Sequence, residues 1–414
     1  SLAARTGRMM PYDVVVCGSG VVGATLACLL ADAGLQVALV DGIARHPARD
    51  EPWDLRTYSL TPASRRILTA AGAWPRLDRA RIAPYHGMQV WDAARGGAID
   101  FDAAANGRAV LGYIVEQSNL LHALASALQA QPRVTMVTGV VETLLPGTDA
   151  VNVQLNGGRG LQARVVAACD GADSPLRELV GIEVDVRDYT QHAVVANVRT
   201  ERPHAGTARP CFLADGPLAF LPLPDPTWSS VVWSTSDEQA TRALAEDEAG
   251  FREELGAAFA HTLGRIEQTS RRLRFPLRWR HARQYGAERV VLAGDSAHLM
   301  HPLAGQGLNV GLLDAAVLAE CVSRAGTSAL RHPRAILRRY ERRRRAEVLL
   351  MLEATDRLCR LFAHPHPAVA WLRSAGLDLT NRAGLVKRLL MTHAMGDGGD
   401  LPDIARPARD AALS

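Results

Sequence analysis

A glycine-rich turn between an apolar strand and a helix constrains this chain more than any other feature. The apolar run from Tyr12 to Cys17 is followed at once by GSGVVG at residues 18–23, and then by a helical pattern through Leu30. A second apolar run, 36–40, ends in an acid at about 20 residues beyond the glycines. Such glycines let the pyrophosphate of a dinucleotide approach the helix N-terminus, and the acid binds a ribose hydroxyl. We therefore predict dinucleotide contacts at Gly18, Gly20, Val22, Gly23 and Asp41.

A second glycine-rich segment runs from Gly294 to Asp314 and reads GDSAHLMHPLAGQGLNVGLLD. The run RVVLA at residues 289–293 predicts a short buried strand before it, and apolar residues recur at helical spacing after it. Gly305 and Gly307 therefore lie where a helix begins. Glycines there allow close backbone approach, and the helix dipole favours an electron-rich, partly anionic ligand. A reduced flavin ring is such a ligand.

A third segment, CDGADSPLR at residues 169–177, follows the apolar run 163–168 and precedes a short helix. In order and spacing, these three segments resemble the signatures of the single-component FAD-dependent aromatic hydroxylases, the class A flavoprotein monooxygenases. Further segments resemble the ubiquinone-biosynthesis subfamily of these enzymes: residues 56–64, 115–117, 340–345, 401–402 and 405–407. The resemblance spans nearly the whole chain from Tyr12 onward.

The strand and helix alternation, together with this resemblance, predicts an α/β fold with a mostly parallel sheet. We expect a discontinuous Rossmann-like FAD-binding domain of the aromatic-hydroxylase type, with an inserted mixed or antiparallel sheet as the substrate domain. The expected bounds are 11–80, 106–184 and 281–345 for the FAD-binding domain, 81–105 and 185–280 for the substrate domain, and 346–414 for a C-terminal helical segment. Residues 192–198, 218–223 and 229–234 are expected as antiparallel strands. Residues 1–10 are expected to be a tag remnant or a disordered lead.

The resemblance also implies roles for single residues. Arg56 and Gln117 are expected near the diphosphate and ribityl chain of FAD, and Asp295 is expected to accept a hydrogen bond from a ribityl hydroxyl. A surface or turn-stabilising role is the alternative for each of them. The segment from Pro302 to Asn309 is expected to line the isoalloxazine ring, and no catalytic residue is assigned. The residues expected there are Pro302, Gly305, Gln306, Gly307, Leu308 and Asn309.

Asp170 has two interpretations that the sequence leaves open. In the family, its segment, with Gly171 and Arg177, is linked to FAD and to the nicotinamide cofactor. Alternatively, Asp170 and Gly171 form a turn, and Ser174 caps a helix that begins at Pro175. His301 could contact a substrate, although a loop-packing role is favoured.

The function implied by the resemblance is aromatic hydroxylation. NADPH or NADH would reduce non-covalent FAD, and molecular oxygen would form a flavin hydroperoxide that hydroxylates a phenolic ring. The favoured substrate is a lipophilic polyprenylated phenol of ubiquinone biosynthesis. A soluble aromatic acid, a secondary metabolite or a non-hydroxylating flavoprotein role are the alternatives. Ring position, oligomeric state and membership of a biosynthetic complex are left open.

Composition excludes several other classes. The 414 residues with 48% hydrophobic content suit a large enzyme, and no apolar run reaches the length of about 18 residues that spans a bilayer. The six cysteines form no CxxC pair and no HExxH occurs, so we expect reduced cysteines, a cytoplasmic protein and no metal site. Lys387 is the only lysine, which disfavours lysine chemistry. Trp228 and Trp233 lack the WxWxIP pattern that is typical of the related flavin halogenases.

The net charge of +4 is unevenly placed, because eight arginines and one glutamate fall between Arg331 and Arg345. Apolar residues at helical spacing accompany them. The simplest interpretation is a long helix with a solvated arginine face. Attraction to anionic lipid headgroups, as a peripheral contact at the inner face of a membrane, is the functional alternative. No nucleic-acid module accompanies the basic run, so nucleic-acid binding is not expected.

Overall fold

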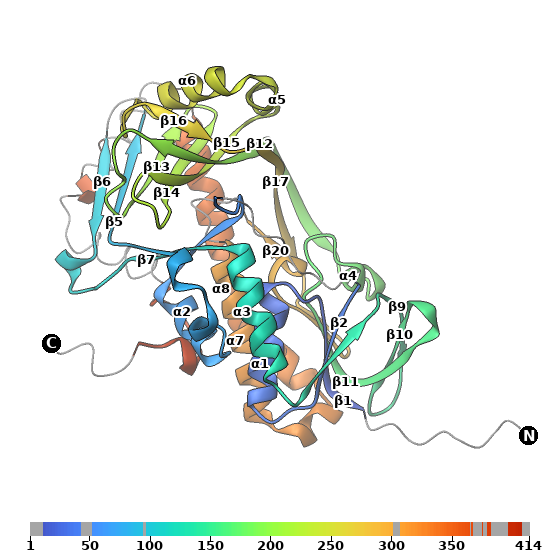
Figure 1. The fold of residues 1–414 in the computed structure, drawn as a ribbon. Coiled ribbons are helices and arrows are strands. Elements are labelled where there is room, and N and C mark those ends of the chain that lie inside the picture. Colours follow the sequence, from blue (N-terminus) through green and yellow to red (C-terminus); the bar gives the residue numbers. More distant parts are fainter. Residues whose placement is uncertain are drawn as a thin grey trace, which may run out of the picture.

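The computed structural model describes residues 11–42, 52–93, 97–300, 307–364, 366, 375, 379–381 and 396–407. His301, Pro302, Gly305 and Gln306, on which predictions were made, lie outside these residues. Figure 1 shows two lobes, each built on its own sheet, with one long helix running from the first lobe to the second. Each lobe has its own apolar core.

The first lobe contains an eight-stranded sheet in the order β18-β19-β11-β1-β2-β8, extended by β10 on β11 and β9 on β10. The pairings among β19, β11, β1, β2 and β8 are parallel, as predicted. The strands are β1 (Tyr12–Cys17), β2 (Val37–Asp41), β8 (Val134–Thr138), β9 (Val141–Pro146), β10 (Val151–Leu155), β11 (Gly160–Ala168), β18 (Gly286–Ala287) and β19 (Val290–Leu292). The predicted first strand is confirmed at its bounds.

Helices cover this sheet. α1 contacts both α3 and α7, and α7 contacts the long helix α8 (Figure 1). These helices are α1 (Val21–Asp32), α3 (Gln117–Gln129), α7 (Gly307–Ala325) and α8 (Arg334–Ala363), with the short α4 (Pro175–Leu179) after β11. α1 approaches α7 closely because Val22 lies against two glycines. A Cβ atom on Gly311 would be 2.7 Å from the Val22 side chain, and one on Gly294 would be 3.2 Å away.

The second lobe contains a nine-stranded sheet in the order β20-β17-β12-β15-β14-β13-β5-β6, with β16 beside β12. Its pairings are antiparallel except β13 with β5, so the predicted mixed sheet is confirmed. The strands are β5 (Gly87–Asp92), β6 (Ala98–Asp102), β12 (Val184–Thr200), β13 (Thr207–Leu213), β14 (Gly216–Pro222), β15 (Trp228–Ser236), β16 (Ile266–Thr269), β17 (Leu273–Ala282) and β20 (His298–Leu299). The helices α5 (Asp237–Ala245) and α6 (Glu248–Ala258) lie over it in Figure 1.

A small antiparallel sheet contains β3 (Thr57–Leu60), β7 (Gly112–Glu116) and β4 (Ile82–Tyr85), and α2 (Pro62–Ala70) follows β3. β20 joins the second sheet although it lies inside the range predicted for the FAD-binding domain. The reason is that β17 is long enough to reach back to it. The predicted domain boundaries themselves stay predictions.

The described chain also contains short 3-10 helices. They are η1 (Trp74–Arg76), η2 (Arg79–Arg81), η3 (Ala104–Asn106), η4 (Asn156–Gly158), η5 (Gly294–Ser296), η7 (Thr327–Arg331) and η8 (Asp403–Ala405).

Residues 396–407, here called the C-terminal strap, return to the first lobe. Leu401 and Ala405 are buried, and Asp397 pairs with Arg66 of α2 at 2.5 Å. Asp400 pairs with Arg343 of α8 at 2.6 Å. The strap therefore ties α2 to α8.

Candidate functional site

A cavity of about 740 Å³ lies between the two lobes. One side is formed by the carboxyl ends of β1, β2 and β11 and by the first turns of α1, α3 and α7. The other side is formed by β12, β15 and β17 of the second sheet. Ligands of open α/β sheets bind outside the carboxyl ends of the strands, so this cavity is the candidate site.

The three glycines of the first turn have different tasks. Gly18 has a φ of +101°, and a Cβ atom there would lie 2.2 Å from the carbonyl oxygen of Cys169. A Cβ atom on Gly23 would lie 1.9 Å from the carbonyl oxygen of Gly18. A Cβ atom on Gly20 would meet nothing within 4 Å, because Gly20 faces the cavity. Gly18 and Gly23 therefore permit close packing, whereas Gly20 keeps the approach to the helix open.

The N-terminus of α1 faces the cavity without a side-chain cap. Asp41, at the end of β2, accepts hydrogen bonds from the backbone N–H of Ser19 at 2.7 Å and from its hydroxyl at 2.5 Å. Ser19 was not predicted as a site residue, yet it fixes the carboxylate of Asp41 beside the turn. An anionic group at the helix end and a hydroxyl near Asp41 suit this arrangement.

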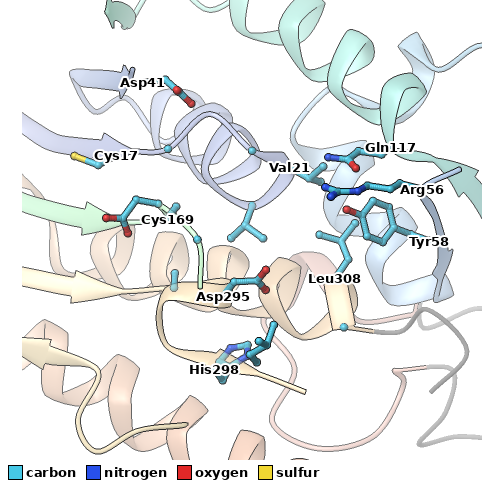
Figure 2. Close-up of a pocket in the computed structure, with 18 of the residues that line it drawn as sticks. Cys17, Val21, Asp41, Arg56, Tyr58, Gln117, Cys169, Asp295, His298 and Leu308 are labelled. Atoms are coloured by element: carbon cyan, nitrogen blue, oxygen red, sulfur yellow. The ribbon is translucent and has the colours of Figure 1, made fainter. Parts of the chain in front are cut away.

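Arg56 and Gln117 come together far from Asp41 in the cavity (Figure 2). The backbone N–H of Gln117 donates to the carbonyl of Arg56 at 2.8 Å, which joins the start of α3 to the start of β3. The Arg56 guanidinium lies 4.8 Å from the ring centre of Phe275. The structure therefore brings together the two residues that the sequence could only pair by resemblance.

Asp295 projects into the cavity near His298 (Figure 2). Solvent reaches its side chain through the cavity. Burial raises the pKa of Asp295 above its ordinary value; His298 opposes this shift and Asp314 adds to it. Burial also raises the pKa of Tyr58 to about 12, with Asp295 contributing. A hydroxyl that donates to Asp295 would stabilise the ionised carboxylate.

Asp170 lines the cavity, but protein groups engage both of its carboxylate oxygens. One accepts from the Ser174 hydroxyl at 2.5 Å and the other from the N–H of Leu176 at 3.1 Å. Ser174 caps α4, and buried Arg177 donates to the carbonyls of Ala172 and Ser296. These contacts favour the structural interpretation of the 170–177 segment. Gly171 lines the cavity as well.

The first turn of α7 supplies Gly307 and Leu308 to the cavity wall. The Asn309 side chain instead holds the protein together. Its oxygen accepts from the Thr61 N–H at 3.0 Å and from the Ser64 hydroxyl at 2.6 Å, and its amide donates to the Ser59 carbonyl at 2.8 Å. Asn309 was predicted to contact the cofactor, but its side chain braces α7 against β3 and α2.

Comparison with known proteins identifies the family. The model of the FAD binding domain family matches residues 11–355. Ubiquinone hydroxylase UbiL of Rhodospirillum rubrum is 37% identical over 93% of this chain and 89% of its own length. The 3-demethoxyubiquinol 3-hydroxylase of Escherichia coli is 33% identical over 93% of this chain and 99% of its own. This chain belongs to the FAD-dependent aromatic hydroxylases, in the ubiquinone-biosynthesis subfamily.

Solved structures share the fold of this hydroxylase. The p-nitrophenol 4-monooxygenase PnpA from Pseudomonas putida has a TM-score of 0.76 at 22% identity, covering 94% of this chain and 99% of its own. HpxO of Klebsiella pneumoniae, solved with FAD and uric acid, has a TM-score of 0.73 at 18% identity. The match covers 93% of this chain and 97% of HpxO. The predicted fold class is confirmed.

The residues of this hydroxylase fit FAD, its cofactor. The open N-terminus of α1 suits the diphosphate, and Asp41 suits a ribose hydroxyl. Asp295 is a carboxylate in the middle of the cavity, where a polyol chain could donate to it (Figure 2). Gly20 keeps space free that a side chain would fill.

The sequence did not identify the wall opposite the glycine turn. β12, β15 and β17 present an apolar surface to the cavity, and Leu299 and Met300 continue it. Side chains alternate between the two faces of a strand, so the sequence could have predicted that Ala193 and Val195, or Phe275 and Leu277, lie on the same face. It could not say which face of the sheet meets the cavity. The apolar wall, as we name it, contains Ala193, Val195, Val232, Phe275, Leu277, Leu299 and Met300.

The basic run divides between surface and interior. Arg344 is buried and pairs with Asp314 at 2.6 Å, and Arg343 pairs with Glu320 at 2.9 Å. The prediction of one solvated arginine face was therefore wrong for these two. Five arginines remain exposed: Arg331, Arg334, Arg338, Arg339 and Arg342.

Two further expectations concern cysteines and metals. All six cysteines are free, and burial raises the pKa of the Cys17 and Cys169 thiols, so both stay neutral. Within the described ranges, no three His, Cys, Asp or Glu side chains gather as metal ligands do. The same ranges contain no helix long and apolar enough to cross a membrane.

Proposed function

We propose that this chain hydroxylates the aromatic ring of a polyprenylated phenol in ubiquinone biosynthesis, using FAD, molecular oxygen and NADPH or NADH. The observation that carries the proposal is the apolar wall facing the glycine turn across one cavity, in a chain that is 37% identical to a ubiquinone hydroxylase. Bound FAD supplies the redox and oxygen-activating chemistry. The protein binds and orients both molecules and excludes water.

Each predicted FAD contact has a proposed task. Gly20 and the N-terminus of α1 bind the diphosphate, while Asp41 accepts from the adenosine ribose. Asp295 accepts from the ribityl chain, and Arg56 with Gln117 contacts the same region. Gly307 and Leu308 lie against the isoalloxazine ring. Support comes from the fact that all these residues line the same cavity.

The cavity favours a neutral, lipophilic phenol over an aromatic acid. Five carboxylate, histidine or arginine side chains are among the described residues that line the cavity. Arg56 is the one arginine, His298 is the one histidine, and the other three are the acids Asp41, Asp170 and Asp295. The Arg56 guanidinium, 4.8 Å from the Phe275 ring centre, is the one arginine beside the apolar wall, and its proposed task is to contact FAD. An aromatic carboxylate would have to share that cation, and burying a charge without a partner of its own is costly. A soluble aromatic acid is therefore the weaker alternative.

Turnover with defined phenols tests the proposal. The holoenzyme is reduced anaerobically, exposed to oxygen, and analysed by mass spectrometry with a prenylated phenol and with its unprenylated analogue. The proposal expects one added oxygen, with a higher kcat/KM for the prenylated ring. Preference for the unprenylated ring would move the activity to soluble aromatics. Reduction without oxygen insertion would indicate a non-hydroxylating flavoprotein. Separate reactions with NADPH and NADH identify the donor.

We further propose a cytoplasmic protein that contacts a membrane peripherally, because its substrate would reside there. The exposed arginines of η7 and α8 supply the charge for this contact. Each well-placed basic residue near an anionic surface contributes about 1 kcal/mol.

A further inference from the structure

Asp314 of α7 is a completely buried carboxylate with three donors around it. One oxygen accepts from the Arg344 Nε at 2.6 Å. The other accepts from the Gly294 N–H at 3.0 Å and from the His298 Nε2 at 2.5 Å. The side chains of Arg344 and His298 are 2% and 4% exposed. The 294–298 segment and α8 therefore meet at one carboxylate of α7.

The charges in this cluster are balanced so that Asp314 stays ionised. Burial alone would raise the pKa of Asp314, but His298 and Arg344 outweigh burial and hold it below the ordinary value. Arg344 also pairs with Glu347 at 2.8 Å. A buried carboxylate with this set of charge-assisted hydrogen bonds holds its partners in a defined geometry.

Two of the three donors lead directly to cavity-lining residues. Gly294 has a φ of +67° and immediately precedes Asp295, so the hydrogen bond from its N–H to Asp314 fixes the backbone from which Asp295 projects. His298 lines the cavity itself (Figure 2), and so does Met300, two residues further along the chain. The third donor, Arg344, anchors the cluster to α8.

We propose that Asp314 is a positioning residue of the FAD site, which sets the place of Asp295 through Gly294 and of β20 through His298. The inference rests on the proposed contact between Asp295 and FAD. Asp314 does not line the cavity, so it acts through other residues. Asp314 ends the 294–314 segment, but the sequence gives no sign that it bonds back to Gly294, twenty residues earlier.

Glu320 provides a matched control on the same pair of helices. It also lies on α7 and accepts from an arginine of α8, Arg343, at 2.9 Å. It receives Arg324 at 3.2 Å as well, and its side chain is 12% exposed. No described cavity residue bonds to Glu320. Asp314→Asn and Glu320→Gln thus each weaken one link between α7 and α8, but of these two side chains only Asp314 hydrogen-bonds to a residue that lines the cavity, His298.

The experiment measures FAD binding in purified holoenzyme, by flavin fluorescence on dilution, together with unfolding in urea. Both variants should lower the unfolding midpoint. Asp314→Asn should raise the Kd for FAD about tenfold and change the absorption spectrum of bound flavin, because one charge-assisted bond to the cavity backbone is lost. Glu320→Gln should leave the Kd within about twofold of wild type. Equal Kd values in both variants, raised or unchanged, would overturn the proposal.

A double-mutant cycle tests the route through Asp295. If Asp314 acts by placing Asp295, then Asp295→Ala with Asp314→Asn should bind FAD about as weakly as Asp295→Ala alone. Fully additive losses would contradict this route. FAD binding requires no substrate, so failure of the hydroxylase proposal would leave these results interpretable.

Should Asp314→Asn not fold, His298 offers a milder probe, because the Asp314 to Arg344 pair remains. His298→Ala should raise the Kd for FAD several-fold, and His298→Gln, which keeps a donor, should restore part of the affinity. Wild-type affinity in a folded His298→Ala protein would reject the role of this cluster.

Discussion

The guanidinium of Arg56 lies 4.8 Å from the ring centre of Phe275, so the residue just before β3 contacts β17 of the second sheet. Both side chains line the cavity. A cation over an aromatic face is attracted to the ring electrons. This contact connects the proposed cofactor side of the cavity to the apolar wall.

Arg56→Met should weaken FAD binding because it removes a cation from the cavity. We expect a Kd about tenfold higher, equivalent to about 1.4 kcal/mol, by fluorescence titration. Arg272→Met is the control, because Arg272 lies at the same 4.8 Å from Phe251 without lining the cavity. Equal loss of FAD from both variants would mean that Arg56 acts through folding.

Gly20→Val and Gly23→Ala should fail for different reasons. A Cβ atom at Gly20 would meet no protein atom within 4 Å, so Gly20→Val should fold and yet lose FAD. A Cβ atom at Gly23 would press on the Gly18 carbonyl, so Gly23→Ala should lower stability itself. Flavin absorbance per folded protein and urea midpoints measure the two effects. Wild-type FAD content in Gly20→Val would refute the dinucleotide turn.

Asp295→Ala should weaken FAD binding without lowering the stability of the apoprotein. Loss of a charged hydrogen bond is worth roughly 1.5–3 kcal/mol, so the Kd for FAD should rise about tenfold to a hundredfold. The folded pKa of Asp295 is raised by burial, so the stability contributed by its protonated form is lost as pH rises through that pKa. Solvent reaches this side chain and screens its charge, so at neutral pH the urea midpoint of the Asp295→Ala apoprotein should equal that of wild type or lie slightly above it. An unchanged Kd would remove Asp295 from the site.

Ala193→Phe should narrow the cavity at the apolar wall and leave FAD bound. Ala193 is small and lies on β12 facing the cavity. We expect kcat/KM for a prenylated phenol to fall about tenfold or more, because misplaced substrate reacts slowly. FAD content is the internal control, since the glycine turn is untouched. Unchanged turnover of the prenylated phenol would place the substrate elsewhere.

Membrane binding should depend on the exposed arginines of α8. Changing Arg338, Arg339 and Arg342 to Gln should reduce co-sedimentation with vesicles that contain an anionic phospholipid. The free energy of vesicle binding should weaken by up to about 3 kcal/mol. The effect should shrink at high salt, because exposed charges are screened over about 10 Å at 0.1 M. The same change at exposed Arg79, Arg133 and Arg159, which alters charge equally, should have little effect. No vesicle binding by wild type would reject the contact.

The sequence was sufficient to predict the fold and the candidate site wherever a local pattern also matches the chemistry of a ligand. The strand from Tyr12 to Cys17 and the glycines after it can serve few folds, because only glycine allows the close approaches at Gly18 and Gly23. The family resemblance supplied Arg56, Gln117 and Asp295, and the fold places all three in one cavity. Their contact with FAD stays a prediction.

Tertiary structure alone decided which side chains share surroundings. The chain order says that Asn309 and Asp314 follow a glycine turn, but only packing shows that Asn309 bonds to β3 and α2 and that Asp314 meets Arg344 from α8. The run of arginines predicts one charged, solvated helix face. In the folded protein, Arg344 is instead buried against the carboxylate of Asp314. Local pattern follows from backbone geometry and short-range sterics, and the sequence records both. The apolar wall and the Asp314 cluster arise from contacts between segments that are distant in the sequence, and these contacts exist only in the folded chain.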